Sequence, residues 1–478
     1  MARRIGHWVC VWLIVSLAAS RADQNSGALL NHTEIRSLVT ERIKALCGEQ
    51  GSVGIVVGVI APEGRQIISA GERSSDDSRP PDGDTAFEIG SVTKVFTALL
   101  LAEMAEKNEV GLNDPVAKHL PSAFKVPERN GKTISLLDLA THTSGLPFMP
   151  NDAAISNGPS AAKYSTGDLR RFVATSELRT DIDGKWEYSN IGYWLLSEAL
   201  TGRGGLDYQT LLRRHVIAPL GLTNTAFALA PEMKKNFAPG HNAVLQAAPP
   251  ISTLPIYSIM PAAGGLYSTA NDLLKLLAVA MDYEHSPLDG AMRLTWNTRR
   301  PMSRDGFEQG LGWTIIREQN SLLIVHDGGT LGYASSIAWD PVKRAGVVVL
   351  SNQVANVGDI ARHLLRPSIP LEKPTATKRT EVTLDPARLD IYVGNYEATG
   401  EGIFEVAREA DSLTLRSPAE WGLPKFRLHP ENRQDFFVAE LPMRVTFQLE
   451  SDGSAKKMLV YPPRGQKPIP AVRSNSSR

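Results

Sequence analysis

The chain has 478 residues, of which 42% are hydrophobic and 21% are charged. These fractions are close to the averages of globular proteins, so they exclude a largely disordered chain and a protein with many membrane spans. Its 51 basic residues balance 51 acidic ones, which gives no electrostatic reason to expect a nucleic-acid partner, and its length favours two domains.

The first residues have the pattern of a secretion signal. Arg3 and Arg4 supply positive charge, an apolar run follows from Trp8 to Ala19, and small residues around Ala22 offer a cleavage site. The run is short for a membrane span, although an uncleaved amphipathic anchor is the alternative. We therefore expect a signal peptide over 1–22, an exported protein that is periplasmic or secreted, and no stable membrane span after cleavage.

Helical and strand-like periodicities alternate along the rest of the chain. Helices are predicted at 34–46, 91–107 and 352–365, with a mostly helical middle over 135–279. Strands are predicted at 54–60, at 66–70 and in short β-branched runs over 312–350. An early hairpin and late strands close most simply as one antiparallel sheet built from both chain ends, with the helical insert covering one side.

The composition changes after the last of these helices. Residues 367–382 contain three prolines and several charges, as a linker does. Short alternating segments then predict a small all-β barrel or sandwich, at 403–407, 413–416, 426–428, 444–449 and 458–461. We therefore predict a large α+β domain over 23–366, a linker over 367–382 and a small β-rich domain over 383–478.

The segment Ser91-Val92-Thr93-Lys94 stands at the start of a long apolar helix. A spacing of three places the hydroxyl and the amine on one face of a helical turn, where they can share a proton. Free backbone N–H groups at a helix N-terminus can also stabilise a developing oxyanion. Only this copy follows a hydrophobic approach and precedes a long helix; three other pairs share the spacing, Ser122/Lys125, Ser160/Lys163 and Ser454/Lys457.

Tyr188-Ser189-Asn190 is the only Tyr-x-Asn in the chain and precedes a helical stretch. One interpretation is structural, with a tyrosine in the core and an asparagine that caps the helix. The other is catalytic. A tyrosine hydroxyl, whose pKa is about 10, becomes a useful base only where a cation favours the phenolate, and Lys94 is a candidate for that cation.

His326-Asp327-Gly328-Gly329, the only His-x-Gly, ends the strand-like run 322–325. It has two interpretations as well. It is either a surface turn with an incidental histidine, or the edge of a binding strand. A pair of glycines on an edge strand lets a substrate backbone approach closely and leaves N–H groups to bind its carbonyl.

In this order the three motifs resemble those of the penicillin-recognising serine hydrolases: class C β-lactamases, the related D-alanyl-D-alanine carboxypeptidases, and esterases that share their site. The resemblance extends over about 34–365 through the similar stretches 136–147, 263–269 and 310–313. It implies a β-lactamase/transpeptidase-like fold, an antiparallel sheet flanked by helices with a helical subdomain. Residues 392–396 are similar to the start of the small β-barrel domain that some of these hydrolases carry.

The resemblance also implies roles for the residues of the first two motifs. Ser91 would attack the substrate carbonyl and form an acyl-enzyme. Lys94 and Tyr188 would manage its proton, and Asn190 would hold the substrate amide. No cofactor and no metal are expected.

The third motif would form the substrate-binding strand, with His326, Gly328 and Gly329 against the substrate. The backbone N–H groups of Ser91 and Gly329 are the candidates for the oxyanion hole. His326 takes the place of a lysine found in many class C β-lactamases. A neutral histidine offers only a hydrogen bond where the lysine offers a fixed positive charge, so the departure favours carboxypeptidases and esterases over a dedicated β-lactamase.

Three functions follow from the resemblance. The first is a hydrolase of D-alanyl peptides or small esters and amides, with cell-wall peptidoglycan among its candidate partners. The second is a class C-type β-lactamase, which requires rapid deacylation. The third is a penicillin-binding receptor that is acylated and deacylates slowly, without real turnover.

Overall fold

The structure is a computed structural model that describes residues 31–48, 53–150, 164–318, 321–372, 379–418, 425–439, 443–451, 453–462 and 467–474. The predicted signal peptide, 1–22, lies outside these residues and stays a prediction. Within the described ranges no helix is both long and apolar enough to cross a membrane.

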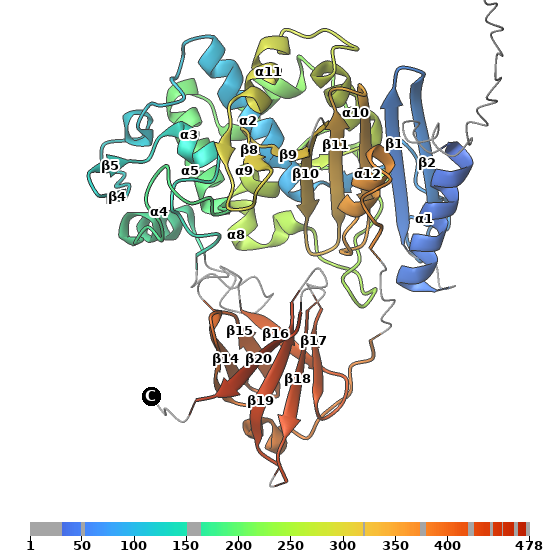
Figure 1. Cartoon of the computed structure of the whole chain (residues 1–478), viewed down its shortest axis with the longest axis vertical. Helices are drawn as coiled ribbons and strands as arrows, with labels where there is room; N and C mark the ends of the chain where they lie inside the picture. Colours follow the sequence, from blue (N-terminus) through green and yellow to red (C-terminus); the bar gives the residue numbers. More distant parts are fainter. Residues whose placement is uncertain are drawn as a thin grey trace, which may run out of the picture.

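An antiparallel sheet forms the centre of the larger domain (Figure 1). The described residues contribute eight strands, in the order β2 (Gly64–Gly71), β1 (Gly54–Ala61), β12 (Ala345–Ser351), β11 (Ala334–Asp340), β10 (Ser321–Gly329), β9 (Thr314–Glu318), β8 (Phe307–Gln309) and β7 (Arg300–Pro301). Strand β1 pairs with β12, so that Ile55 lies opposite Ser351. The prediction of one sheet built from both chain ends is therefore confirmed.

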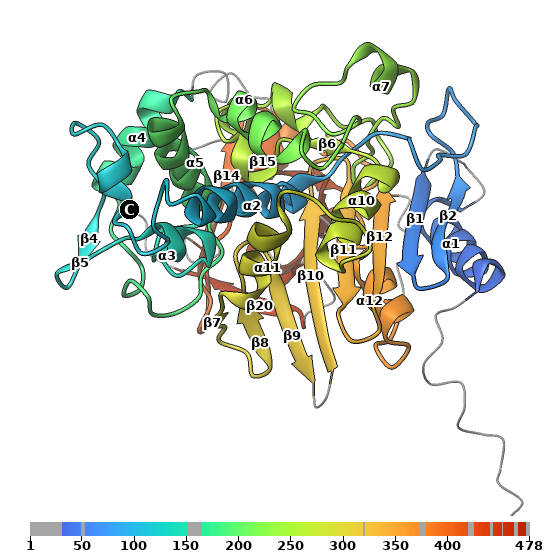
Figure 2. The ribbon, with the colours of Figure 1, turned by 90° about the horizontal axis from the view of Figure 1, so that it is seen from above.

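Helices cover both faces of this sheet, as Figure 2 shows from above. On one face lie α1 (His32–Cys47) and α12 (Gly358–Leu365), and on the other α2 (Thr93–Glu106), α10 (Ala270–Ala280) and α11 (Asp289–Asn297). Strand β1 is buried along its whole length because its apolar side chains alternate between the two faces. Val56 and Ile60 join the larger core, whereas Ile55 and Val57 join the core beneath α1 and α12.

The middle of the chain is mostly helical, as predicted. Its described helices are α3 (Leu136–Ala140), α4 (Thr166–Thr175), α5 (Asn190–Gly204), α6 (Tyr208–Leu212), α7 (Pro231–Lys235), α8 (Pro255–Ser258) and α9 (Pro261–Gly264). Two short strand pairs accompany them, β3 (Phe87–Glu88) with β6 (Tyr267–Ser268) and β4 (Glu128–Arg129) with β5 (Lys132–Thr133). The helices α2, α5 and α9 meet one another, and this junction positions the site described below.

The helix predicted over 352–365 begins only at Gly358, so the prediction for 352–357 is wrong. The side chain of Asn352 instead accepts from Gly54 N at 2.7 Å and donates to Arg73 O at 2.8 Å, which ties β1 to its surroundings. Asn356 Oδ1 accepts from Gly358 N at 3.0 Å. Asparagine side chains that bond to the backbone in this way compete with helix formation.

The smaller domain is a closed antiparallel barrel that lies below the larger domain in Figure 1. Eight strands of the described residues form it: β13 (Gly394–Ala398), β14 (Gly402–Glu409), β15 (Ser412–Arg416), β16 (Phe426–Pro430), β17 (Asp435–Val438), β18 (Met443–Leu449), β19 (Ala455–Tyr461) and β20 (Ile469–Arg473). The five predicted strands are present. Strands β13, β17 and β20 escaped prediction because they are short and contain glycine, aspartate or proline, which are depleted in strands.

The described ends of the predicted linker, 367–382, contact different domains. Ile369 and Leu371 pack against the core beneath α12. Val382 N donates to Pro430 O at 2.8 Å in the barrel. Residues 373–378 lie outside the described residues, so the linker and the domain boundaries stay predictions.

Candidate active site

Ser91 lies in a short 3-10 helix, η1 (Gly90–Val92), which leads into α2. Its Oγ accepts a hydrogen bond from Lys94 Nζ at 3.0 Å. Gly90 has a φ of +48°, and a Cβ atom there would lie 2.7 Å from the nitrogen of Gly329. A glycine is therefore required for η1 to rest against the end of β10, and this contact holds Ser91 beside Gly329.

Lys94 is enclosed, with 0% of its surface exposed. Its Nζ also donates to Ala263 O at 2.6 Å and lies 4.8 Å from the centre of the Tyr188 ring. Burial removes water from the amine and lowers the pKa of Lys94 well below its usual value. A lowered pKa favours the unprotonated amine, which can accept the proton of Ser91, so the pair has the chemistry of a nucleophile and its general base.

Tyr188 reaches the Lys94 amine from the turn that precedes α5. Ser189 caps this helix, and its Oγ donates to Pro147 O at 2.7 Å, which fixes the turn against the segment after α3. The structure therefore brings the second motif to the first, although Lys94 and Tyr188 are 94 residues apart in the sequence. This proximity is one requirement of the catalytic interpretation of Tyr188; an unprotonated Lys94 does not meet the other, a cation that favours the phenolate.

Asn190 is buried at the first position of α5. Its side-chain nitrogen lies 3.5 Å from Met149 Sδ, a weak acceptor. Its Oδ1 is buried and has no hydrogen-bond partner among the described residues. An amide oxygen in this state can accept a hydrogen bond from a substrate N–H group, as the resemblance implies.

His142 completes the support of Tyr188, and the sequence had given it no role. Its ring centre lies 4.3 Å from that of Tyr188, and its Nδ1 accepts from Ser189 N at 3.1 Å. Burial lowers the pKa of His142 well below its usual value, so the ring is neutral. The available signal was a histidine inside the family-like stretch 136–147, without any sign of what it would contact.

The end of β10 presents an open edge. Strand β9 pairs with β10 only as far as Val325, which lies opposite Thr314. Residues 326–329 pair with β11 on the other side. A Cβ atom at Gly328 would lie 2.1 Å from Ile89 O, so the strand end touches the segment that precedes Ser91. The third motif is thus at the site, next to an edge to which an extended substrate can add.

The backbone of Gly329 is directed toward this edge. Thr330 N donates to Tyr333 O at 3.0 Å, which makes these two residues a hydrogen-bonded pair of the β10–β11 ladder. Hydrogen-bonded and non-bonded pairs alternate along an antiparallel ladder, so the Gly329 N–H points away from β11. It points to the side of Gly90 and Ser91, where an oxyanion hole is predicted.

His326 is 5% exposed, and its Nδ1 lies 2.6 Å from Gly312 O. Burial lowers the pKa of His326 below its usual value. The imidazole is therefore neutral near pH 7.

The other Ser-x-x-Lys pairs lie elsewhere. Ser122 and Lys125 are both exposed, in a surface segment. Lys457 is exposed on the barrel strand β19. The pair Ser160/Lys163 lies outside the described residues.

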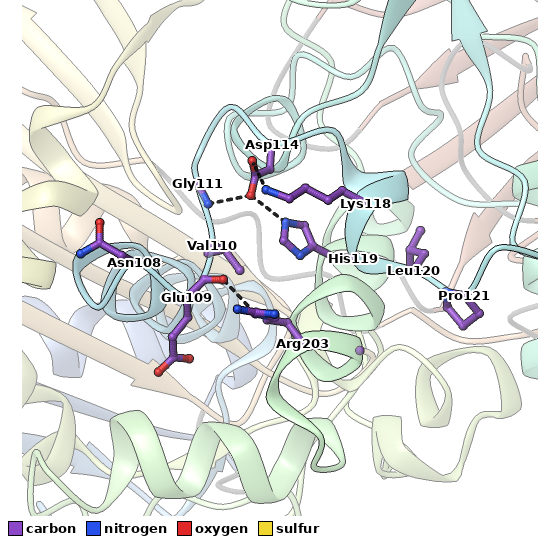
Figure 3. A pocket seen from close by; sticks show the side chains of 11 residues that line it. Asn108, Glu109, Val110, Gly111, Asp114, Lys118, His119, Leu120, Pro121 and Arg203 are labelled. Carbon is purple, nitrogen blue, oxygen red and sulfur yellow. Dashed lines mark hydrogen bonds and ion pairs between the residues drawn. The ribbon is translucent and has the colours of Figure 1, made fainter.

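A cavity of about 660 Å³ lies near the far end of α2 (Figure 3). Asp114 forms one side, where it accepts from Lys118 at 2.8 Å and contacts His119 at 2.9 Å. The cavity is lined by residues that follow α2, whereas Ser91 precedes this helix. A 14-residue helix is roughly 20 Å long, so the cavity and Ser91 lie at opposite ends of it. It is thus not part of the site. In the part of the chain that the structure describes, no group of three or more His, Cys, Asp or Glu residues is placed to hold a metal ion.

Known proteins are similar to this chain over most of its length. The chain is 26% identical over 351 residues to the D-alanyl-D-alanine-carboxypeptidase/endopeptidase AmpH of Escherichia coli (strain K12), which covers 70% of this chain and 89% of the relative. It is 27% identical over 357 residues to a β-lactamase of Pseudomonas fluorescens, in an alignment that covers 67% of this chain and 94% of that relative. A class C β-lactamase from Rhodobacter sphaeroides superposes with a TM-score of 0.58 at 23% identity, over 70% of this chain and 96% of that one.

Family models divide the chain in two. One described as a domain of unknown function (DUF3471) matches residues 378–470, the region of the barrel. One described as Beta-lactamase matches residues 35–366, well over half of the chain. The chain therefore belongs to the beta-lactamase family of serine hydrolases, and its larger domain has the fold of the class C β-lactamases.

Proposed function

We propose that the protein is an exported serine hydrolase that works through an acyl-enzyme on Ser91, on D-alanyl peptides or on small esters and amides. The observation that carries the proposal is the hydrogen bond of 3.0 Å between Ser91 Oγ and the buried Lys94 amine. This pair stands beside the open end of β10, where a substrate carbonyl can be bound.

In the proposed mechanism the neutral Lys94 amine takes the proton of Ser91 as Oγ bonds to the substrate carbonyl carbon. The backbone N–H groups of Ser91 and Gly329 stabilise the negative charge on the carbonyl oxygen. The tetrahedral intermediate collapses, and the leaving group departs with a proton that Lys94 returns through Tyr188. Water then attacks the acyl-enzyme and loses a proton to Lys94, which returns it to Ser91 Oγ as the bond between Oγ and the acyl carbon breaks and the acid product leaves.

The named relatives support different substrates. The printed name of the Escherichia coli relative, a carboxypeptidase/endopeptidase, supports D-alanyl peptides and thus cell-wall peptidoglycan. The β-lactamase of Pseudomonas fluorescens, at 27% identity, supports the second candidate, a class C-type β-lactamase. A slow-deacylating receptor would retain the same residues and is the third outcome of the test below.

The test is incubation of the purified protein with nitrocefin, a p-nitrophenyl ester and a D-alanyl-D-alanine peptide, followed by intact mass measurement. Turnover of the ester or peptide without nitrocefin turnover supports the first function. Steady nitrocefin turnover would favour the β-lactamase, and a lasting adduct without turnover would favour the receptor. Full activity of Ser91→Ala on all three would overturn the mechanism.

Export is tested separately. The positive and apolar pattern of residues 1–22 supports it. Expression of the full chain in a bacterium should yield a mature protein in the periplasm or medium whose mass lacks these residues. A full-length protein that stays in the cytoplasm would contradict export without touching the proposed chemistry.

A further inference from the structure

Glu88 carries a buried carboxyl group three residues before Ser91. It ends β3 and is 2% exposed. Its Oε1 accepts a hydrogen bond from Ile251 N at 2.8 Å and another from the Tyr267 hydroxyl at 3.1 Å. Burial raises the pKa of Glu88, and the hydroxyl of Thr330 is close enough to oppose this rise.

The surroundings of this carboxyl offset little of its desolvation. Burial of a carboxyl costs free energy that an apolar side chain of the same size would avoid. The described groups that bond to Glu88 are neutral, a backbone N–H and hydroxyls. Its Oε2 lacks a donor in full hydrogen-bond geometry among the described residues, so Thr330 adds only a weak polar contact. Stability of the fold alone therefore does not account for a carboxyl here.

The bond to Ile251 N reaches a segment that also touches the end of β10. Shortly before Ile251 in the chain, His241 N donates to Gly332 O at 3.1 Å. A Cβ atom at Gly332 would lie 2.8 Å from Ala248 Cβ, so the contact is close. Gly332 lies in the turn between β10 and β11. Glu88 therefore joins the strand before the nucleophile to the segment on which this turn rests.

The two predicted oxyanion donors lie on the two sides of this connection. One is the Ser91 N–H and the other is the Gly329 N–H. The contact of η1 with the end of β10 limits how near the two groups come, but packing alone does not prevent them from moving apart. Hydrogen bonds that span the two sides do so. Glu88 supplies one, and Ser335 Oγ, which donates to Ile89 O at 2.8 Å, supplies another.

We propose that Glu88 is a positioning residue: its hydrogen bonds fix the separation of the Ser91 and Gly329 N–H groups, and with it the affinity of the site for an oxyanion. This role rests on the proposed acyl-enzyme function and deepens it. Glu88 acts through the backbone around the site and not on the substrate itself.

The test measures the binding of an oxyanion separately from the binding of substrate. Phenylboronic acid forms a tetrahedral adduct with serine nucleophiles and mimics the transition state of acyl transfer. Its inhibition constant is measured on the full chain. Acylation by the p-nitrophenyl ester gives two further quantities, the maximal rate of acylation and the ester concentration at half of that rate. Because acylation is followed directly, a slow deacylator is covered.

Two variants of Glu88 separate its hydrogen bonds from its size. Glu88→Met has a similar volume and accepts hydrogen bonds only weakly. We expect it to lower the maximal acylation rate by about 10²-fold and to raise the inhibition constant of phenylboronic acid by about the same factor, as for a misplaced oxyanion donor. The half-saturating ester concentration should change by less than about threefold, because contacts with the bound ester remain. Glu88→Gln retains the acceptor oxygen and should restore the rate and the inhibition constant to within about threefold of the wild type.

Glu103→Met is the matched control. Glu103 is another buried glutamate, near the far end of α2, where it contacts His215 at 3.1 Å. Its variant should lower the melting temperature and leave acylation per folded molecule unchanged. If Glu88→Met does not fold, Tyr267→Phe takes its place. Loss of this donor should weaken acylation and boronic acid binding together by about fivefold, the usual contribution of one hydrogen bond.

Wild-type values in Tyr267→Phe or in a folded Glu88→Met would overturn the positioning role, and so would slower acylation without weaker binding of phenylboronic acid. Equal losses in Glu88→Gln and Glu88→Met would also overturn it, because the charge and not the hydrogen bonds would then matter. Failure of the underlying function has a different result. In that case the wild type would neither bind phenylboronic acid nor be acylated by the ester, or Ser91→Ala would react as the wild type does.

Discussion

Lys94 sets the pH dependence of the proposed reaction. Its unprotonated amine is the base, and burial lowers the pKa of Lys94 well below its usual value. Activity should therefore be present well below the usual pKa of a lysine and fall as the pH drops through the lowered pKa, because protonation removes the base. Measurement of kcat/KM for the p-nitrophenyl ester as a function of pH checks this prediction. Activity that appears only at the pKa of an ordinary lysine would contradict the prediction.

Replacement of Lys94 by arginine, which stays charged, should remove the general base at every pH. Lys94→Arg is expected to lower kcat/KM by about 10²–10⁴-fold, the usual contribution of a general base. Lys125→Arg, an exposed lysine in one of the other Ser-x-x-Lys pairs, is the matched control and should behave as the wild type. Comparable losses in both variants would mean that the effect is not specific to the site.

His142 should act by positioning Tyr188. It has a φ of +59° and accepts from Ser189 N. Asparagine tolerates this φ and offers an oxygen near the place of Nδ1, whereas leucine offers neither. We expect His142→Leu to lower kcat by about 10²-fold and His142→Asn by clearly less, as for a misplaced catalytic group. Equal losses in kcat would show that only the volume of the ring matters, and a change confined to KM would contradict positioning.

At the scale of elements, the contact between η1 and β10 is the most sensitive. A methyl group at Gly328 would meet Ile89 O at 2.1 Å, whereas one at Gly329 would meet nothing nearer than 3.9 Å. Gly328→Ala should therefore separate the strand end from Ser91 and lower kcat/KM by at least about 10²-fold, as a displacement near 1 Å does. Gly329→Ala should lower kcat/KM by less than Gly328→Ala does. Similar kinetics of the two variants would show that the contact is not needed.

The sequence predicted those parts of the site that depend on local geometry. The Ser91–Lys94 distance follows from helical spacing, and the sheet follows from periodicity at both chain ends. The support of Tyr188 by His142, and of His326 by Gly312, depends on segments that meet only in the folded chain. No spacing within one element encodes such contacts. Asn352 shows the converse, since its local pattern favoured a helix and a tertiary hydrogen-bond network kept it out of one.

At the scale of the molecule, the barrel has its own core, and its contact with the larger domain includes a hydrogen bond from Ala243 N to Ala439 O of 3.0 Å. A chain that ends after Glu372 should therefore fold and turn over the small ester within about threefold of the full chain. This shortened chain retains the hydrogen bond of 2.8 Å from Glu372 N to the Asp359 carboxylate. The same carboxylate forms an ion pair with Arg42. Melting temperature and kcat/KM check both expectations.

A chain that ends after Leu365 is the informative comparison. It lacks Ile369 and Leu371, which pack on the core beneath α12, and the Glu372 carbonyl that Arg42 contacts. We expect a loss of about 2–4 kcal/mol in the free energy of unfolding relative to the chain that ends after Glu372, from lost apolar burial and a weakened buried ion pair. Equal stability of the two truncated chains would show that 366–372 is dispensable.

The pairing of β1 with β12 also determines when the central sheet can form during synthesis of the chain. The two strands lie side by side although one ends at Ala61 and the other begins at Ala345. Contacts of such long sequence separation form late, because most of the intervening chain must be present first. A nascent chain halted before β12 would hold a hairpin and a helical middle without their common sheet. The barrel strands, in contrast, each pair mainly with the next in sequence and can close soon after they emerge.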